Sequence, residues 1–449
     1  MKSIRIGSGS AWMGDRVEPA RWSADRGALD YMCFETMAEV TISMAQVRKA
    51  EDPNAIGWDP YLDDRMEAVL PGCLKAGTRI VSNQGWVDPE GAADRVRWHL
   101  RKLGATGKKV ACVTGGVVTD RMDRCGPILE TGADPTGFGD ALLSAEAYLG
   151  AEPIARALGM GADIVITGRC ADPALFLGPM LHEFGWTLDD LDRLGAGAAI
   201  GHLMECAAQI TGGYFSDPGF KDVPEPWNLG FPIADVTEDG ACVLGKLEGT
   251  GGRISLGSVK EQMLYEVHDP RAYVTPDVVV DFSTAKLTEL NDGRVRIEGV
   301  TGKPRPERLK VSIGCREGYI GEDMFLYAGP GALDRAKLAK RILEERFRIV
   351  GLKADEVRID FVGYNSVHGA ATPADAPEPY EVAVRIAART QTYAEAFKVG
   401  REVDGMAVSG VAMTGKRGGH RQRVREVVGV WSAMIDRDAV APEITMLEV

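Results

Sequence analysis

The feature that most constrains this fold is a repeated alternation in the first 195 residues. Short apolar runs, each followed by a turn with Gly or Asn, alternate with stretches of helical periodicity. The apolar runs are residues 3–6, 29–34, 78–81, 109–113 and 162–166, and the clearest helical stretches are residues 89–103 and 141–158. Such alternation is typical of parallel βαβ units with right-handed crossovers. We therefore expect a doubly wound, mainly parallel α/β domain over residues 1–195.

The pattern changes after residue 195. A loop rich in Pro and Gly is followed by short runs that alternate with a period of two, and an Asn-Asp-Gly turn at residues 291–293 favours a hairpin. The expected helices are residues 198–210, 332–350 and 392–403, and the expected strands include residues 241–244 and 294–297. Residues 196–449 are therefore expected to form an α+β domain with a mixed sheet.

Composition and charge narrow the classes of partner. The 449 residues carry a net charge of −13, which repels nucleic-acid phosphates and anionic lipid headgroups. A locally basic stretch at residues 414–425 is best explained as a solvated loop. The eight cysteines contain no C-x-x-C pair, which fits reduced thiols and shows no zinc signature. Without an export signal or a run of ~20 apolar residues, we expect a cytoplasmic protein that binds neither nucleic acid nor membrane.

Small polar residues follow the predicted strands at the edge where an open parallel sheet binds its ligands. They include a Gly-Ser-Gly-Ser turn, whose backbone N–H groups could approach an anion, and two arginines that could hold a carboxylate or phosphate. The candidate substrate-binding residues here are Gly7, Ser8, Gly9, Ser10, Asp15, Arg16, Asn83, Gln84 and Arg169. A plain tight turn explains the first four equally well, and either arginine could instead pair with Asp15 or Asp172. The pattern matches neither the dinucleotide fingerprint nor a phosphate loop.

A second Gly-rich loop lies in the second half. Lys246 precedes Thr250, Gly251 and Gly252, and a helix is expected directly after them. Backbone donors, the hydroxyl and the amine could together cradle a phosphate or carboxylate. A flexible hairpin loop explains the same residues almost as well.

Histidine is the natural acid or base near neutral pH, and the chain has six. His202 and Glu205 are three residues apart on a predicted helix and share a face, so the carboxylate could orient the imidazole. These two and Asp172 are the candidate catalytic residues. Cys206 could add a soft metal ligand, but no second His cluster has a suitable spacing, so no metal is predicted. A structural pair explains His202 and Glu205 slightly better, and His368 is the next candidate.

Several long phrases of the sequence resemble the acyclic terpene utilisation (AtuA-like) family. They are GSAWMGDR (residues 9–16), IVSNQGWVDP (80–89), GADIVITGRCADPALFLGPMLHEFGW (161–186), GHLMECAAQITGG (201–213), GTGGRISLGSVKEQMLYEVHDP (249–270) and PDV (276–278). The resemblance runs from residue 4 to the end of the chain. It departs at Gln84-Gly85-Trp86, where the family more often has Ala-Gly-Gly, and this change lies beside the predicted crevice.

The resemblance implies a setting in which branched acids are processed as CoA thioesters. It also implies a small ferredoxin-fold domain, which this chain is expected to lack and to meet as a separate partner. The leading hypothesis is an enzyme of branched or terpene-derived acid or acyl-CoA catabolism, of the hydratase, dehydratase or isomerase type. His202 would be the acid/base and Glu205 its orienting group, with Arg169, Asn83 and residues 7–10 holding the anionic ends.

Two further expectations accompany this hypothesis. No cofactor is predicted apart from CoA as part of the substrate, and a homo-oligomer is expected. The alternative from another class is a non-catalytic acyl-CoA-binding or assembly subunit that acts with its small ferredoxin-fold partner.

Overall fold

The computed structural model describes residues 1–412, 414–416 and 423–449. The chain divides into two compact units. The first consists of Met1–Gly314 with Val430–Val449, and the second of Cys315–Gly429. Each unit is described by itself below.

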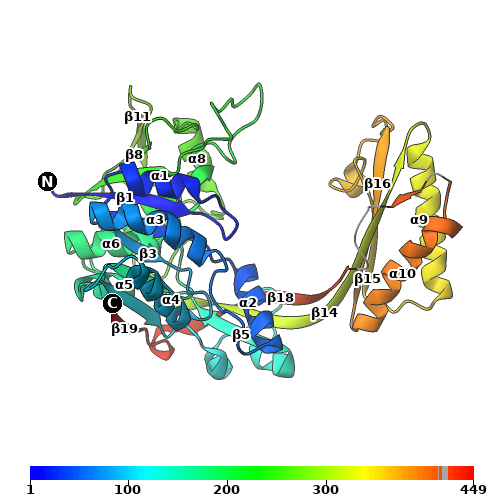
Figure 1. The fold of residues 1–449 in the computed structure, drawn as a ribbon, viewed down its shortest axis with the longest axis horizontal. Coiled ribbons are helices and arrows are strands. Elements are labelled where there is room, and N and C mark those ends of the chain that lie inside the picture. Colours follow the sequence, from blue (N-terminus) through cyan, green and yellow to red (C-terminus); the bar gives the residue numbers. More distant parts are fainter. Residues whose placement is uncertain (413, 417–422) are drawn as a thin grey trace. The chain divides into compact units, whose positions relative to one another are not determined.

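A ten-stranded sheet forms the centre of the first unit (Figure 1). Five neighbouring strands are parallel, in the order β1 (Ser3–Ser10), β2 (Tyr31–Phe34), β3 (Arg79–Ser82), β6 (Ile164–Thr167) and β4 (Lys109–Thr114). These are the five apolar runs of the sequence, so the predicted parallel sheet is confirmed.

Antiparallel strands extend this sheet at both edges. Beyond β1 follow β7 (Pro232–Thr237), β8 (Cys242–Lys246), β12 (Val295–Glu298) and β11 (Lys286–Glu289), and beyond β4 follows β19 (Glu443–Glu448). The predicted hairpin at residues 291–293 joins β11 to β12, and Gly293 takes a φ of 76° there. Residues on both sides of position 195 therefore share one sheet, and the expected domain boundary at 195 stays a prediction.

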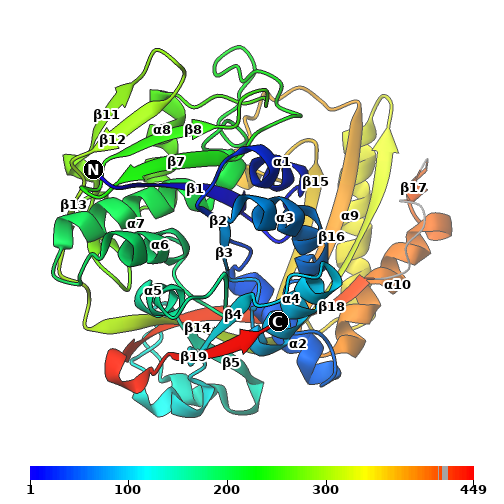
Figure 2. The same cartoon turned by 60° about the vertical axis from the view of Figure 1, so that its left-hand side comes forward.

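Successive residues of the parallel strands enter two different hydrophobic cores. Tyr31 and Cys33 of β2 belong to one core, and Met32 and Phe34 belong to the other. Strands that are buried on both faces have such continuous apolar runs. The first core includes residues of α5 (Glu152–Gly159), α6 (Ala174–Phe184) and α7 (Leu191–Glu205), and the second includes residues of α1 (Glu18–Arg26), α3 (Leu62–Ala76) and α4 (Pro89–Lys102). Figure 2 shows α6 and α7 on one side of β1 to β3 and α1 and α3 on the other.

The Gly-Ser-Gly-Ser segment corrects the sequence prediction. Residues 7–10 are not a turn after the first strand but the second half of β1 itself. The strand continues because Gly7 pairs with Met32 of β2 and with Ile233 of β7. Glycine is needed for close packing, since a Cβ on Gly9 would lie 2.5 Å from the Phe34 ring.

The prediction of a helix over residues 141–158 is also wrong in its first half. Residues Leu142–Ala147 form β5, which pairs with β14 (Arg308–Ala328), and α5 begins only at Glu152. Pairing with a distant strand overrides the helix propensity of this Ala-rich segment. The helix starts next to Pro153, which suits a first helical turn.

The remaining elements of the first unit complete its edges. They are α2 (Glu39–Glu51), α8 (Leu256–Leu264), the small sheet of β9 (Tyr273–Val274), β10 (Val279–Asp281) and β13 (Thr301–Lys303), and the 3₁₀ turns Thr119–Arg124, Pro135–Ala141, Ala207–Gln209, Phe282–Thr284 and Arg437–Ala439. The helices expected over residues 89–103 and 198–210 correspond to α4 and to the end of α7.

The second unit is a layer of helices on an antiparallel sheet. Its helices, α9 (Ala332–Ile349) and α10 (Tyr393–Ser409), pack on strands with the order β15 (Glu356–Val362), β16 (Glu381–Thr390), β14 and β17 (Gly415–Lys416), and β18 (Arg423–Asp436) also pairs with β14. A 3₁₀ turn, Gly369–Ala371, lies between β15 and β16. Both helices confirm the expectation for residues 332–350 and 392–403. Most of the basic stretch at 414–425 lies outside the described residues.

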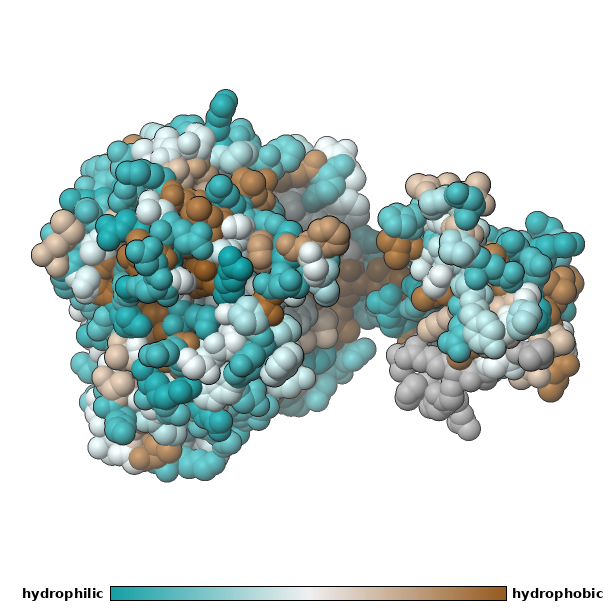
Figure 3. All heavy atoms as spheres, turned by 90° about the horizontal axis from the view of Figure 1, so that it is seen from above, coloured by the Kyte–Doolittle hydropathy of each residue, from teal (hydrophilic) through white to brown (hydrophobic). Residues whose placement is uncertain are grey.

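The surface is mixed in character. Figure 3 shows hydrophilic and hydrophobic residues interspersed on the face that it draws. Among the described residues, no helix combines the length and the apolar character needed to cross a membrane.

Candidate functional site

Arg169 is a buried cation directly after β6, at the carboxyl end of the parallel sheet. Its Nη1 donates to the carbonyl of Met37 at 2.7 Å, and its Nε donates to the carbonyl of Cys170 at 2.7 Å. Its Nη2 forms an ion pair with Asp172. The guanidinium also lies 4.4 Å from the centroid of the Tyr148 ring. Every face of this guanidinium is therefore engaged by the protein.

Three carboxyl groups surround this one cation. Burial raises the pKa of Glu35, and the negative charge of Asp172 raises it further, while Arg169 opposes both effects. Burial likewise raises the pKa of Glu205, with a contribution from Asp172. The pKa of Asp172 is raised by burial and lowered in part by Arg169. A single guanidinium cannot balance three carboxylates, so the pKa values of all three carboxyl groups are raised.

Asn83 supports one member of the cluster. Its Nδ2 donates to Glu35 Oε1 at 3.0 Å, and its Oδ1 accepts from the backbone N–H of Thr36 at 2.9 Å. The Met37 N–H donates to the same Glu35 oxygen at 2.7 Å. Asn83 is fully buried and holds a carboxyl group of the protein, so its role in binding a substrate stays a prediction.

Asp172 differs from the other two because it faces a cavity. About 340 Å³ of space lies beside it, and 36% of its side chain is exposed there. We call this space the apolar cavity. It is lined by Leu129, Tyr148, Ala171, Asp172, Pro173, Tyr273, Val274, Thr275, Pro276, Pro306, Arg308, Leu309, Lys310 and Met434. A mostly apolar wall with a few convergent polar groups is typical of small-molecule sites.

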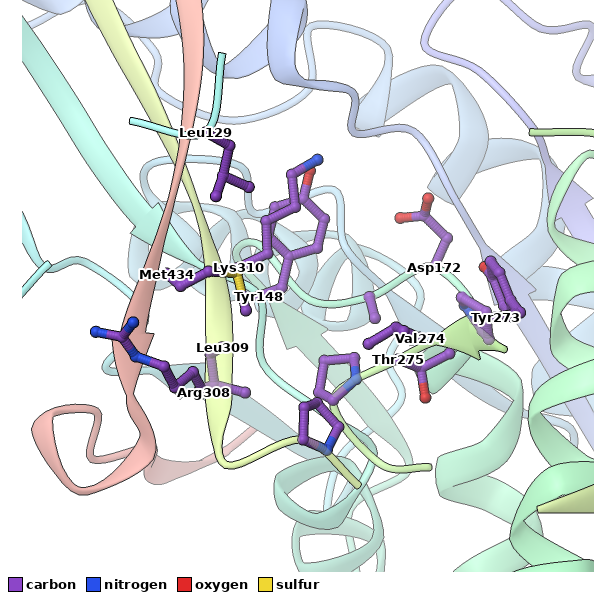
Figure 4. Close-up of a pocket in the computed structure, with 14 residues that line it drawn as sticks. Leu129, Tyr148, Asp172, Tyr273, Val274, Thr275, Arg308, Leu309, Lys310 and Met434 are labelled. Carbon is purple, nitrogen blue, oxygen red and sulfur yellow. The ribbon is translucent and has the colours of Figure 1, made fainter. Parts of the chain in front are cut away.

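The charged groups of the apolar cavity lie at opposite sides. Figure 4 shows Asp172 and Tyr273 on one side, and Lys310 and Arg308 on the other. Lys310 Nζ lies 3.0 Å from Glu39 Oε1, and the Tyr148 hydroxyl donates to the same oxygen. Although burial opposes it, these two contacts lower the pKa of Glu39 to about 2. Lys310 therefore sits in a fixed position with its charge at the cavity wall.

His202 and Glu205 form the pair that the helix spacing predicts. His202 Nδ1 lies 3.1 Å from Glu205 Oε1 on α7. Burial lowers the pKa of His202 to about 4 and raises that of Glu205. Burial therefore disfavours the charged form of both groups, and a single proton between Nδ1 and Oε1 can serve this contact. His202 is 1% exposed and lies behind Tyr273, with 5.0 Å between the ring centroids, so its catalytic role stays a prediction.

Ser8 and Ser10 join the strands to this cluster. Ser8 Oγ donates to the carbonyl of Met204 on α7 at 2.5 Å, and Ser10 Oγ donates to the carbonyl of Glu35 at 2.7 Å. Both are fully buried and bind protein groups, and Gly7 and Gly9 leave room for the side chains of Leu29 and Phe34.

Other predicted binding residues lie away from the cluster. Asp15 accepts from the N–H groups of Ala11 and Arg16, and Arg16 Nη1 donates to the carbonyl of Trp227. Gln84 Nε2 donates to Asp59 Oδ2 at 2.9 Å. Asp59 is ion-paired at 2.6 Å with Arg65, whose other nitrogen donates to the carbonyls of residues 12 and 13. This network holds the loop at residues 11–16 in place.

The donors of the second Gly-rich loop are also engaged. Lys246 Nζ donates to the Thr250 carbonyl at 2.6 Å, and the Thr250 hydroxyl donates to the Leu247 carbonyl. The N–H groups of Gly251 and Gly252 donate to the carbonyls of residues 228 and 224. The loop therefore closes on itself, and its role in binding a substrate stays a prediction.

Four residues of this region lay outside the sequence hypothesis. Tyr148 was placed in a helix, although it follows β5. Tyr273 and Lys310 come from later segments without a motif, and Glu35 directly follows β2. The position of Glu35 directly after a strand was the one sequence signal that could have identified it as a site residue. Among the described residues, no group of three or more His, Cys, Asp or Glu side chains is placed to hold a metal ion.

One comparison with known proteins identifies the family. The model of a family described as acyclic terpene utilisation family protein AtuA matches residues 4–446. No curated protein and no solved structure is similar to the chain. The match covers nearly the whole sequence, and the chain therefore belongs to the AtuA family of acyclic terpene utilisation.

Proposed function

We propose that this protein is an enzyme that moves a proton next to the carbonyl of a branched carboxylic acid or its CoA thioester. The reaction would be hydration, dehydration or double-bond isomerisation in terpene catabolism. The observation that carries the proposal is Asp172, a carboxylate with a raised pKa that opens into an apolar cavity. A raised pKa makes a carboxylate a better base, and the apolar wall suits a hydrocarbon chain.

The chemistry needs only proton transfers. Asp172 takes a proton from a carbon near the carbonyl, and the electron pair moves toward the carbonyl oxygen. In isomerisation the same proton returns to a different carbon. In dehydration the hydroxyl group leaves as water with that proton. Carbon is neither oxidised nor reduced overall, so Asp172 can act without a redox partner.

The cations and hydroxyl groups of the cavity would bind the carbonyl or carboxylate end of the substrate. Lys310 and Arg308 face Asp172 across the cavity and can hold a carboxylate or stabilise an enolate oxygen. Tyr273 lies on the same side as Asp172 and can donate a hydrogen bond to the reacting group. The cavity of about 340 Å³ suits the acyl part of a substrate, so CoA, when present, would extend outside it.

Arg169, Glu205 and His202 act through Asp172 in this scheme. Arg169 fixes the orientation of the Asp172 carboxylate, and Glu205 lies near enough for the charge of Asp172 to raise its pKa. His202 in turn orients Glu205. They are positioning residues, and the direct acid/base role of His202 is the next proposal to test. A homo-oligomer and a separate ferredoxin-fold partner remain expectations from the sequence.

Deuterium exchange tests the proposal without knowledge of the natural substrate. The protein is incubated in D₂O with 3-methylbut-2-enoate or its CoA thioester, and NMR follows deuterium entry at carbon. We expect exchange with the wild type and a loss of about 10²- to 10⁴-fold for Asp172→Asn. Asp292→Asn, at an exposed turn, is the matched control and should exchange normally.

Two outcomes would reject the catalytic proposal. One is equal exchange by the wild type and Asp172→Asn. The other is saturable binding of the acid or thioester without any exchange, which would favour a non-catalytic binding subunit. A melting curve for each variant separates loss of chemistry from loss of fold.

A further inference from the structure

A second cavity lies at the carboxyl ends of β3, β4 and β6, on the other side of Arg169 from the apolar cavity. It has a volume of about 220 Å³. We call it the acidic cavity. It is lined by Trp86, Val87, Asp88, Pro89, Glu90, Val113, Thr114, Gly115, Gly116, Val117, Glu146, Leu149, Gly168 and Arg169. The two cavities share no lining residue. This edge is the usual ligand position in an open parallel sheet.

Glu146 is the buried charge of this cavity. It is 2% exposed, and its Oε1 accepts one hydrogen bond, from Gln46 Nε2 at 3.3 Å. Among the described residues, none bonds to its Oε2. A carboxylate that is almost entirely removed from water and accepts a single hydrogen bond from the protein is costly. The second oxygen of Glu146 is therefore available to a hydrogen-bond donor in the cavity.

The rest of the wall favours a cation over an anion. The start of α4 already carries the Asp88 carboxylate, which accepts from the Gly91 N–H at 3.0 Å, and Pro89 has no N–H to offer. Glu90 adds another carboxylate. Arg169 is the one cation of the wall, and its donors are engaged by Asp172 and two carbonyls. The carboxylates of the wall would repel an anion and attract a cation.

Volume and chemistry limit the kind of cation. A cavity of about 220 Å³ has room for several waters or for a molecule of a few non-hydrogen atoms. A bare metal ion would need several ligands together, and no such group occurs among the described residues. An ammonium group needs only one or two carboxylates, and Val113, Val117 and Leu149 supply an apolar wall for its carbon atoms. We infer that the acidic cavity binds a small organic ammonium ion whose N–H groups donate to Glu146.

Binding should depend on pH through Glu146. Burial raises the pKa of Glu146 to about 7, while the hydrogen bond from Gln46 and the charge of Arg169 limit the shift. The other charged groups near the cavity are Asp88 and Glu90 at its wall, Lys49, which pairs with Asp88, and Arg48, which lies against Trp86. An ammonium ion needs the ionised carboxylate, so affinity should fall about tenfold per pH unit below about 7.

The test uses ethylammonium chloride as the probe and isothermal titration calorimetry of the full chain. Sodium chloride at equal ionic strength provides the background. At about pH 8 we expect saturable binding that weakens at least tenfold in Glu146→Gln. Gln keeps the shape of the side chain and its contact with Gln46, so folding should be preserved. Glu289→Gln, on the exposed strand β11, is the matched control and should bind as the wild type does.

The inference is independent of the proposed function because Asp172→Asn should leave ethylammonium binding unchanged. Absence of saturable binding to the wild type would overturn it. So would equal binding by Glu146→Gln, or a loss of binding in Asp172→Asn that Glu146→Gln does not share. A crystal grown with the probe should show the ammonium nitrogen at Glu146 Oε2, and density only elsewhere would contradict the assignment.

Discussion

The apolar and the acidic cavity lie on either side of one ion pair and offer opposite charges. Lys310 and Arg308 face the apolar cavity across from Asp172, whereas Glu146, Asp88 and Glu90 line the acidic one. Arg169 belongs to the acidic wall, yet its charge is engaged by Asp172 of the apolar wall. A single buried guanidinium can thus separate two environments with different ligand preferences. The ligand edge of a parallel sheet is therefore not one anion crevice in this protein.

The largest expected effect comes from removing the shared cation. Arg169→Met leaves Asp172 and the buried Glu35 and Glu205 without their compensating charge. We expect the free energy of unfolding to fall by about 3–5 kcal/mol, measured by urea denaturation at neutral pH. Arg294→Met, at an exposed pair with Asp292, should cost less than about 1 kcal/mol. Similar costs for both variants would mean that Arg169 does not organise the two cavities.

Glu146 of the acidic cavity should make the free energy of unfolding depend on pH. The pKa of Glu146 is raised by burial from 4.5 to about 7, so the folded state holds this proton more tightly than the unfolded chain. The contribution of Glu146 to the free energy of unfolding is fully present below about pH 4.5 and is lost as pH rises through about 7. The loss should be on the order of 3 kcal/mol.

Urea unfolding at about pH 5 and about pH 8 measures this contribution. Glu146→Gln carries no titrating group and should lose less stability over this interval than the wild type. Glu289→Gln should follow the wild type. If the free energy of unfolding of Glu146→Gln changed with pH as much as that of the wild type, Glu146 would not be buried as described.

The smallest effect is expected for a residue outside both cavities. Arg16 was a candidate for binding the anionic end of the substrate, but its guanidinium donates to the Trp227 carbonyl in an exposed position. Arg16→Ala should change both stability and the affinity for a branched carboxylate by less than about 0.5 kcal/mol. A larger loss of affinity, measured by calorimetry, would place the acid at the loop of residues 11–16 instead.

The sequence predicted the parts of the fold that depend on local patterns. Five apolar runs became the parallel strands, and a Pro-initiated amphipathic stretch became α4, because burial on both faces and helical periodicity are both visible in a few residues. Residues 7–10 and 142–147 were misjudged because their conformation depends on distant partners. The first segment pairs with β2 and β7, and the second pairs with β14.

The site residues likewise divide into those that local spacing predicts and those that only tertiary packing brings to the site. Asn83 and Arg169 follow strands closely, Asp172 lies three residues after Arg169, and His202 and Glu205 share a helix face, so these positions could be inferred from spacing. The later segments that carry Tyr273 and Lys310 reach the cavity only through tertiary packing. Glu146 was hidden in a stretch with helical propensity. Spacing also could not show that Gln84 would turn toward Asp59 and away from the crevice.

The opposite charge preference of the two cavities is the central claim, and a crossed titration tests it most directly. Calorimetry measures 3-methylbutanoate and ethylammonium against the wild type, Lys310→Met and Glu146→Gln at about pH 8. We expect Lys310→Met to weaken the carboxylate about tenfold, the usual scale for a charged hydrogen bond, and to leave ethylammonium unchanged. Glu146→Gln should do the reverse. Loss of both ligands in one variant, or a carboxylate that depends on Glu146, would contradict the account.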